Sequence, residues 1–250
     1  MKSAVTILVM VILVPHLNGQ EPDLDLNVLT DAYFREKVDP LAKLLPFAMG
    51  GYFTGDIEFL QPGEFRLSVN GETNFVSTEL SIGPMNGVDR FSLPMFNIAL
   101  GVDPRAEVTG KFSAINIGNR AVIITGYGLR YRTYSNETGD RGISFGVMVN
   151  ALRGPEDFRI WDATLHLDLM KIGKSRSFKA SIGVDFSEMR IAVKDKEDDN
   201  LLNDINENIE KTQSWVGIGI SQNFGNGLFS FFQFQQGQSR RLNIGIGVRL

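Results

Sequence analysis

The last nine residues, Leu242-Asn243-Ile244-Gly245-Ile246-Gly247-Val248-Arg249-Leu250, alternate strictly between an apolar side chain and a glycine or polar one. A period of two is typical of a β-strand that has one face in apolar and the other in polar surroundings. The alternation recurs over 143–149, 165–169, 178–187 and 216–221, and less regularly over 65–69, 108–114 and 122–134. Roughly ten strands are therefore expected after residue 60.

Short turn signals separate many of these strands. They are Asn70-Gly71, Gly118-Asn119, Thr138-Gly139-Asp140 and Asn226-Gly227. Turns of this length join antiparallel neighbours, and no helical pattern lies between the strands. The sequence therefore predicts an all-β antiparallel meander.

The N-terminus is different in character. Lys2 precedes an apolar run from Ala4 to Val14, which is too short to span a bilayer as a helix and is typical of a signal peptide, here expected to cover residues 1–19. From residue 25 to 51 apolar side chains recur at spacings of three and four, which predicts helix. Asp39-Pro40 is expected to break it and start a second helix that ends at Gly50-Gly51. The expected division is thus a signal peptide, a helical segment over 20–51 that plugs or caps the barrel, and a barrel over 52–250.

Composition excludes several classes of protein. With 43% hydrophobic and 22% charged residues the chain fits neither a disordered protein nor a helical membrane protein. The absence of cysteine excludes disulfides and thiolate metal sites, and a net charge of −4 argues against nucleic acid as a partner. An acidic, Asn-rich stretch over 194–211 is expected to be an external loop, because it lacks the ligand spacing of a strong calcium site. We expect no metal and no cofactor.

The less apolar strand faces carry the charges that a water-filled or salt-bridged lumen would need. The lumen-lining candidates are Glu107, Lys111, Arg130, Arg132, His166, Asp168, Lys179, Asp185 and Arg249. Aromatic residues near strand ends, namely Trp215, Phe224, Phe232 and Phe234, suggest interfacial girdles. These features predict a transmembrane β-barrel of about ten strands (8–12) in the outer membrane of a Gram-negative cell. Its expected partners are outer-membrane lipids, the barrel-insertion machinery and a small apolar or anionic solute. The alternative is a secreted or periplasmic soluble barrel or sandwich that binds a ligand.

Three groups of short motifs suggest a family. They are Tyr33-Phe34 with Asp39-Pro40-Leu41-Ala42-Lys43 through Gly50-Gly51-Tyr52, then Leu93-Pro94-Met95 with Asn97-Ile98-Ala99-Leu100-Gly101, and Gly126-Tyr127-Gly128-Leu129-Arg130. In these the chain resembles an uncharacterised family of outer-membrane β-barrel proteins from Bacteroidota-like bacteria, itself loosely similar to long-chain fatty-acid transporter barrels. The resemblance implies a helical segment ending in glycines, a strand opening at Leu-Pro, and an outer-membrane location, with transport only as an analogy.

Two functional hypotheses follow for the inward charges. The cations either favour anionic solutes in a pore, or form salt bridges with Glu107 and Asp185 that close a small lumen. His166 and Asp168 share a strand face and resemble half of a hydrolase site, as in a lipid-editing barrel enzyme, but no nucleophile is evident. A polar lumen pair, and no enzymatic activity, is therefore expected. We expect passive transport of small or hydrophobic solutes or a structural role, with the helical segment plugging the lumen, lying at the membrane interface or capping the periplasmic mouth.

Overall fold

The computed structural model describes residues 24, 26, 34–50, 56–117, 120–155, 157–193 and 205–250, so the expected signal peptide lies outside the described residues. Within these ranges there is one α-helix, α2 (Phe34–Met49), and two short 3-10 helices, η3 (Thr78–Leu80) and η4 (Gly83–Met85). The strands are β1 (Phe65–Phe75), β2 (Arg90–Asp103), β3 (Ala106–Ile117), β4 (Arg120–Ser135), β5 (Arg141–Arg153), β6 (Phe158–Lys171), β7 (Arg176–Val193), β8 (Ile205–Gly225), β9 (Leu228–Gln236) and β10 (Arg240–Arg249).

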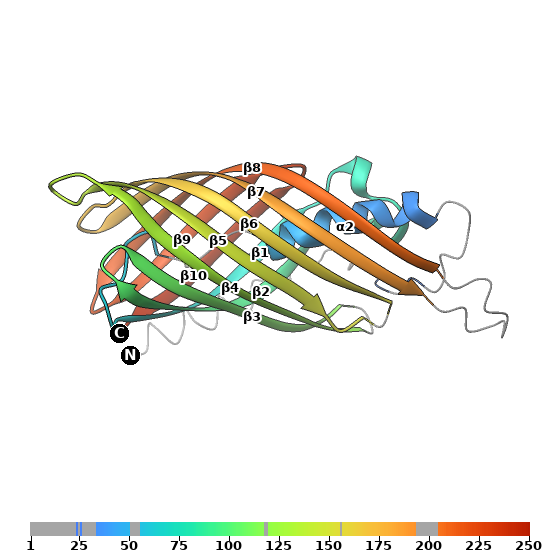
Figure 1. Ribbon diagram of the computed structural model, residues 1–250, viewed down its shortest axis with the longest axis horizontal. Helices are drawn as coiled ribbons and strands as arrows, with labels where there is room; N and C mark the ends of the chain where they lie inside the picture. Colours follow the sequence, from blue (N-terminus) through green and yellow to red (C-terminus); the bar gives the residue numbers. More distant parts are fainter. Residues whose placement is uncertain are drawn as a thin grey trace.

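Each strand pairs antiparallel with its sequence neighbour, and β1 also pairs with β10, which closes the sheet into a barrel (Figure 1). At the closing seam Leu67 is the partner of Val248 and Val69 of Ile246. Closure removes the free sheet edges, as a bilayer requires. The predicted all-β fold of about ten antiparallel strands is confirmed.

One predicted turn is wrong. Asn70-Gly71 lies inside β1, where Gly71 is paired with Pro94 on one side and Ile244 on the other. The Asn70 side chain points into the barrel and accepts a hydrogen bond from Asn97. Pairing on both edges therefore outweighs the local turn preference of Asn-Gly. Asn226-Gly227 is a hairpin turn as predicted, with positive φ values of 50° and 76°.

The outer surface carries an apolar belt between two charged rows. On β6 the outward side chains run from Arg159 through Trp161, Ala163, Leu165, Leu167 and Leu169 to Lys171. On β5 the corresponding row runs from Arg141 to Arg153. Twelve residues of a tilted strand rise roughly 30 Å, which matches the hydrocarbon thickness of a bilayer.

The structure describes only part of the acidic stretch over 194–211. Residues 194–204 lie outside the described residues, whereas Ile205 to Lys211 form the start of β8 and pair with β7. The predicted loop is therefore wrong for these residues. Their outward side chains, including Asn206, Asn208 and Glu210, are exposed and polar, because this end of β8 extends beyond the apolar belt.

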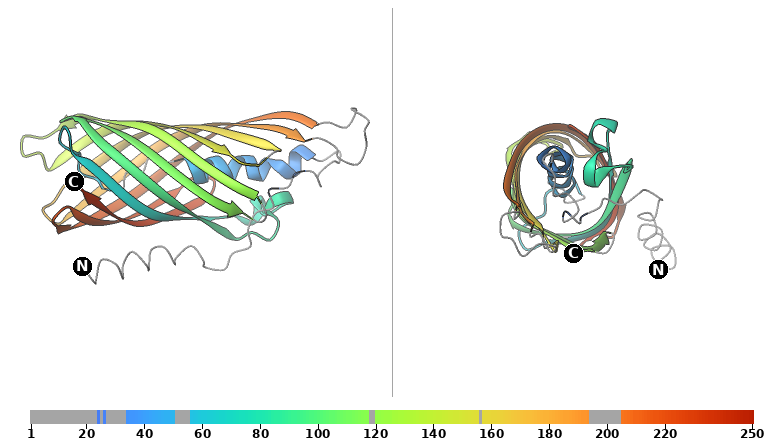
Figure 2. Two further views of the ribbon diagram at one scale, coloured as in Figure 1. Left: turned by 90° about the horizontal axis from the view of Figure 1, so that it is seen from below. Right: turned by 90° about the vertical axis from the view of Figure 1, so that its right-hand side faces the viewer.

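Helix α2 lies inside the barrel near one mouth, as the end-on view shows (Figure 2). We call this mouth the helix end, and the opposite mouth, where Leu250 pairs with Phe65, the C-terminal end. The predicted break at Asp39-Pro40 is wrong, because α2 continues through Pro40 and Pro46. Each proline removes one backbone N–H donor. Burial of most of the helix surface against the barrel wall compensates for these losses.

The inner wall at the helix end is apolar where it meets α2. Leu41, Leu44 and Leu45 pack in one buried cluster with side chains such as Phe158 and Ile191 from the wall. Among the described residues, no helix is long and apolar enough to cross a membrane.

Candidate functional site

The interior of the barrel is the candidate site, and all nine predicted lumen residues point into it. Glu107, Lys111, Arg130, His166, Asp168, Lys179 and Asp185 are buried, whereas Arg132 and Arg249 are partly exposed. They do not form one cluster. They divide between an arginine-rich site near the C-terminal end, a central set on β5 to β8, and a group that holds the end of α2.

The site near the C-terminal end is centred on Glu107 of β3. Its Oε1 lies 2.7 Å from Nη2 of Arg66 on β1 and 3.0 Å from Nη2 of Arg130 on β4. The three side chains are at most 1% exposed. One carboxylate thus pairs with two guanidinium groups away from water and leaves this cluster with a net positive charge, so each partner depends on the others.

These arginines also hold a segment of the chain inside the lumen. Residues 56–61, which we call the lumen segment, precede β1 without belonging to the wall. Arg66 donates to the Glu58 carbonyl at 2.9 Å, and Arg130 donates to the same carbonyl at 3.2 Å. The Leu60 N–H donates in turn to Oε2 of Glu107. The backbone of the lumen segment is therefore bound directly to the charged wall.

Side chains of the lumen segment add to this attachment. The Phe59 ring lies between two guanidinium groups, 4.0 Å from Arg130 and 4.4 Å from Arg132. Arg249 of β10 forms ion pairs with Asp56 and, at 2.7 Å, with Glu58. The segment thus supplies the acidic and aromatic groups that complement four arginines of the wall.

The C-terminal end of α2 is held by wall cations. Lys111 of β3 donates to the carbonyls of Met49 and Gly50, and Arg241 of β10 donates to those of Phe47 and Gly50. The last carbonyls of a helix lack partners within the helix and carry partial negative charge. The two buried cations therefore supply both the missing hydrogen-bond donors and the compensating positive charge.

The mouth at the helix end has its own ionic contact. Lys211 of β8 and Lys43 of α2 both pair with Asp39. Partial burial alone would raise the pKa of Asp39, but hydrogen bonds from Lys211 and Lys43 hold that pKa below its usual value. Together with the Gln213 amide, which donates to the Lys43 carbonyl at 2.7 Å, this contact ties α2 to β8.

In the central set, buried aspartates accept hydrogen bonds from uncharged side chains. Asp185 accepts hydrogen bonds from Thr164 at 2.7 Å and from the Trp215 indole at 3.1 Å. Trp215 is only 3% exposed, so its predicted place in an interfacial girdle is wrong. It points inward because it lies on the same face of β8 as Gln213.

His166 and Asp168 lie together on the inner face of β6. The His166 Nε2 is 3.6 Å from Oδ2 of Asp168, and Asp168 also accepts a hydrogen bond from Ser181 at 2.6 Å. The hydroxyl of Ser181 is thus directed at the acid and not placed as a nucleophile activated by the imidazole. Among the described residues, no group of three or more His, Asp or Glu side chains is arranged to hold a metal ion.

Sequence reasoning missed several residues of the site. Arg66 and Arg241 are inward cations of β1 and β10, and the lumen segment contributes Asp56, Glu58 and Phe59. The alternation of the last strand, extended back by one step from Asn243, would have placed Arg241 on the inner face. No comparable signal exists for the lumen segment, because it follows neither a helical nor a strand period.

Comparisons with known proteins find barrels of similar architecture. The chain is similar to the outer membrane protease OmpT from Escherichia coli at 7% identity and a TM-score of 0.41, covering 79% of this chain and 100% of the other. It is similar to the KdgM porin at 8% identity and a TM-score of 0.38, covering 73% and 98%. The N-terminal β-barrel domain of Pseudomonas aeruginosa OprF matches at 10% identity and a TM-score of 0.36, covering 76% and 100%. At these identities and TM-scores the likenesses carry no argument about activity.

No family model matches the chain. No curated protein matches it either. The resemblance to a Bacteroidota-like barrel family therefore stays a prediction.

Proposed function

We propose that this chain is an outer-membrane barrel whose lumen is closed by α2 and the lumen segment and which passes small anionic solutes when these two parts are displaced. Residues 51–55, which lie between them in the sequence, are outside the described residues. The observation that carries the proposal is the attachment of both parts to wall cations through their backbone carbonyls and carboxylates.

The membrane location rests on the outer surface. Side chains in the middle of the apolar belt are widely exposed, including Ile182 at 61%, Ile218 at 60% and Leu169 at 56%. An apolar surface that encircles the whole barrel would not be stable in water. A soluble binding protein, the alternative from sequence, would need a partner to cover it.

Barrels of this kind carry short periplasmic turns and longer external loops. The connections at the C-terminal end, such as 104–105, 136–140 and 226–227, are all short. The helix end has a short connection at 237–239, but it also has a long one, residues 76–89 between β1 and β2. This difference favours a periplasmic C-terminal end and an external helix end.

Selectivity follows from the charges that displacement would uncover. Arg249 would lose Asp56 and Glu58, while Arg66 and Arg130 would still share the single carboxylate of Glu107. A lumen with excess arginine favours anions. Apolar solutes would have to pass these buried charges, so we infer that they are poor substrates.

Conductance in planar bilayers tests the proposal. The variant Asp56→Ala/Glu58→Ala should open more often than the unchanged chain and should pass chloride in preference to potassium. The matched control Glu79→Ala/Asp89→Ala removes two acids from the external connection between β1 and β2 and should conduct like the unchanged chain.

A cross-link shows whether openings need movement of α2. The chain has no cysteine, so Asp39→Cys/Lys211→Cys joined by a short bismaleimide would tether α2 to β8. Tethering should abolish the openings of the Asp56→Ala/Glu58→Ala variant. If that variant, without the tether, does not conduct in bilayers that contain folded barrel, a structural role is favoured instead.

A further inference from the structure

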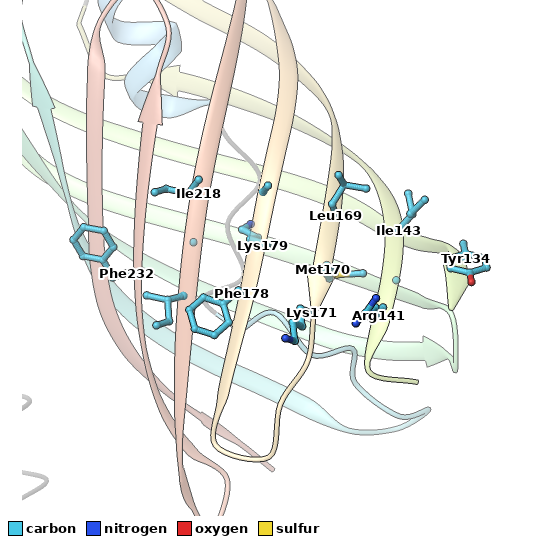
Figure 3. A pocket seen from close by; sticks show the side chains of 14 residues that line it. Tyr134, Arg141, Ile143, Leu169, Met170, Lys171, Phe178, Lys179, Ile218 and Phe232 are labelled. Atoms are coloured by element: carbon cyan, nitrogen blue, oxygen red, sulfur yellow. The ribbon is translucent and has the colours of Figure 1, made fainter. Parts of the chain in front are cut away.

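The outer wall has a groove near the C-terminal end. It has a volume of about 730 Å³ and spans β5 to β9, with Tyr134 of β4 at its margin (Figure 3). Its depth comes from a small residue, because Ala180 of β7 is flanked in register by Leu169 and Ile218.

Two cations stand at the edge of this groove. Arg141 of β5 and Lys171 of β6 are direct register partners, and both are exposed on the outward face (Figure 3). Like charges directly opposite each other destabilise a sheet. Among the described residues, no carboxylate lies within ion-pair distance of either side chain. An external anion between them would relieve the repulsion.

The surroundings specify the kind of anion. The two cations belong to one row of paired residues that runs around the barrel from strand to strand. After Lys171 on β6, this row continues with Phe178, Ile220 and Phe232 on β7, β8 and β9. The charges therefore lie directly beside apolar side chains. Tyr134 places an amphipathic ring at the same level. A ligand with a phosphate beside acyl chains complements both parts.

A second groove provides an internal comparison. It has the same volume of about 730 Å³ and is lined by apolar side chains such as Leu67, Phe96 and Ile246. The cation in its lining, Lys111, points into the lumen. The second groove therefore offers apolar contact without an outward charge.

We propose that the first groove binds an anionic phospholipid of the adjoining leaflet, with its phosphate between Arg141 and Lys171 and its acyl chains over Ala180. This inference rests on the proposed membrane location and adds a specific lipid site to it. Phosphatidylglycerol is the probe, because phosphatidylcholine with the same chains differs in lacking a net negative charge.

Native mass spectrometry of the full chain in mixed phosphatidylglycerol and phosphatidylcholine micelles measures the preference. Arg141→Gln/Lys171→Gln should weaken phosphatidylglycerol retention about 30-fold, as expected for two interfacial cations, and leave phosphatidylcholine unchanged. Ala180→Phe should weaken both lipids by filling the groove. The control Arg153→Gln/Arg159→Gln removes two outward cations from the opposite edge of the same strands, and Val69→Phe fills the second groove. Both controls should behave like the unchanged chain.

A competition with glycerophosphoglycerol separates a lipid site from a simple anion site. The headgroup without chains should compete at least tenfold less well than the whole lipid. Equal retention of both lipids, equal loss in the opposite-edge control, or full competition by the headgroup would each overturn the inference. Failure of the folded chain to insert into bilayers would overturn the proposed function as well, whereas insertion without lipid preference would overturn the lipid site alone.

Discussion

Replacing Glu107 by Gln should destabilise the barrel more than any single exposed charge substitution. The substitution keeps the shape of the side chain but removes the charge that lies 2.7 Å from Arg66 and 3.0 Å from Arg130. Two buried guanidinium groups would then face each other without a carboxylate. Removing one partner of a buried ion pair costs about 3–5 kcal/mol. We expect about 3 kcal/mol here, because the Glu58 carbonyl still accepts from both arginines.

Urea unfolding in detergent micelles, followed by tryptophan fluorescence and by loss of heat-modifiable mobility, measures this change. The control Glu188→Gln breaks a Glu–Arg pair with a similarly short distance of 2.6 Å, but the Arg190 side chain in that pair is 70% exposed. It should leave the unfolding midpoint unchanged, since exposed pairs contribute little. The triple variant Arg66→Met/Glu107→Leu/Arg130→Met should recover most of the lost stability. Equal unfolding midpoints for Glu107→Gln and Glu188→Gln would refute the reasoning.

Three further predictions concern the belt, the helix and a turn. Ile218→Lys, in the apolar belt, should cost about 2–4 kcal/mol of folding free energy in bilayers. Asn208→Lys, outward on the same strand where β8 extends beyond the belt, should cost about 1 kcal/mol or less. Urea titration in vesicles measures both changes. Lys111→Met removes a cation from the end of α2, so added protease should cleave residues 40–49 faster than in the control Lys179→Met. Equal cleavage rates in the two variants would contradict this. Hydrogen bonds from Thr138 and Asn136 hold the pKa of Asp140 below its usual value. The ionised carboxylate therefore stabilises this turn fully above the usual carboxyl pKa, and this stabilisation is lost as the pH falls through the lowered pKa of Asp140. A carboxyl-carbon NMR titration of Asp140 should show a midpoint that rises in Thr138→Val, and identical midpoints would contradict this.

The wall of the barrel was largely predictable from sequence because its physical cause is local and periodic. Leu242 to Leu250 alternate as they do because each residue faces either lipid or lumen. The same alternation places Glu107, Arg130 and Arg249 inside without any knowledge of their partners.

The contents of the lumen were not predictable, since they depend on contacts between distant segments. Asp39-Pro40 has the local pattern of a helix start, yet burial of α2 against the wall keeps the helix continuous. Asn70-Gly71 has the pattern of a turn, yet pairing with β2 and β10 keeps it extended. The lumen segment has no period, and its place depends on contacts with distant wall residues such as Arg66, Glu107 and Arg249.

The central claim is that a folded barrel with an apolar outer belt spans a membrane. The most direct measurement is gel mobility, with and without boiling, of the expressed protein from washed outer membranes and from the soluble fraction. The account predicts a membrane-bound species that resists extraction by alkaline carbonate and changes mobility on boiling. A soluble species with the same mobility before and after boiling would contradict it.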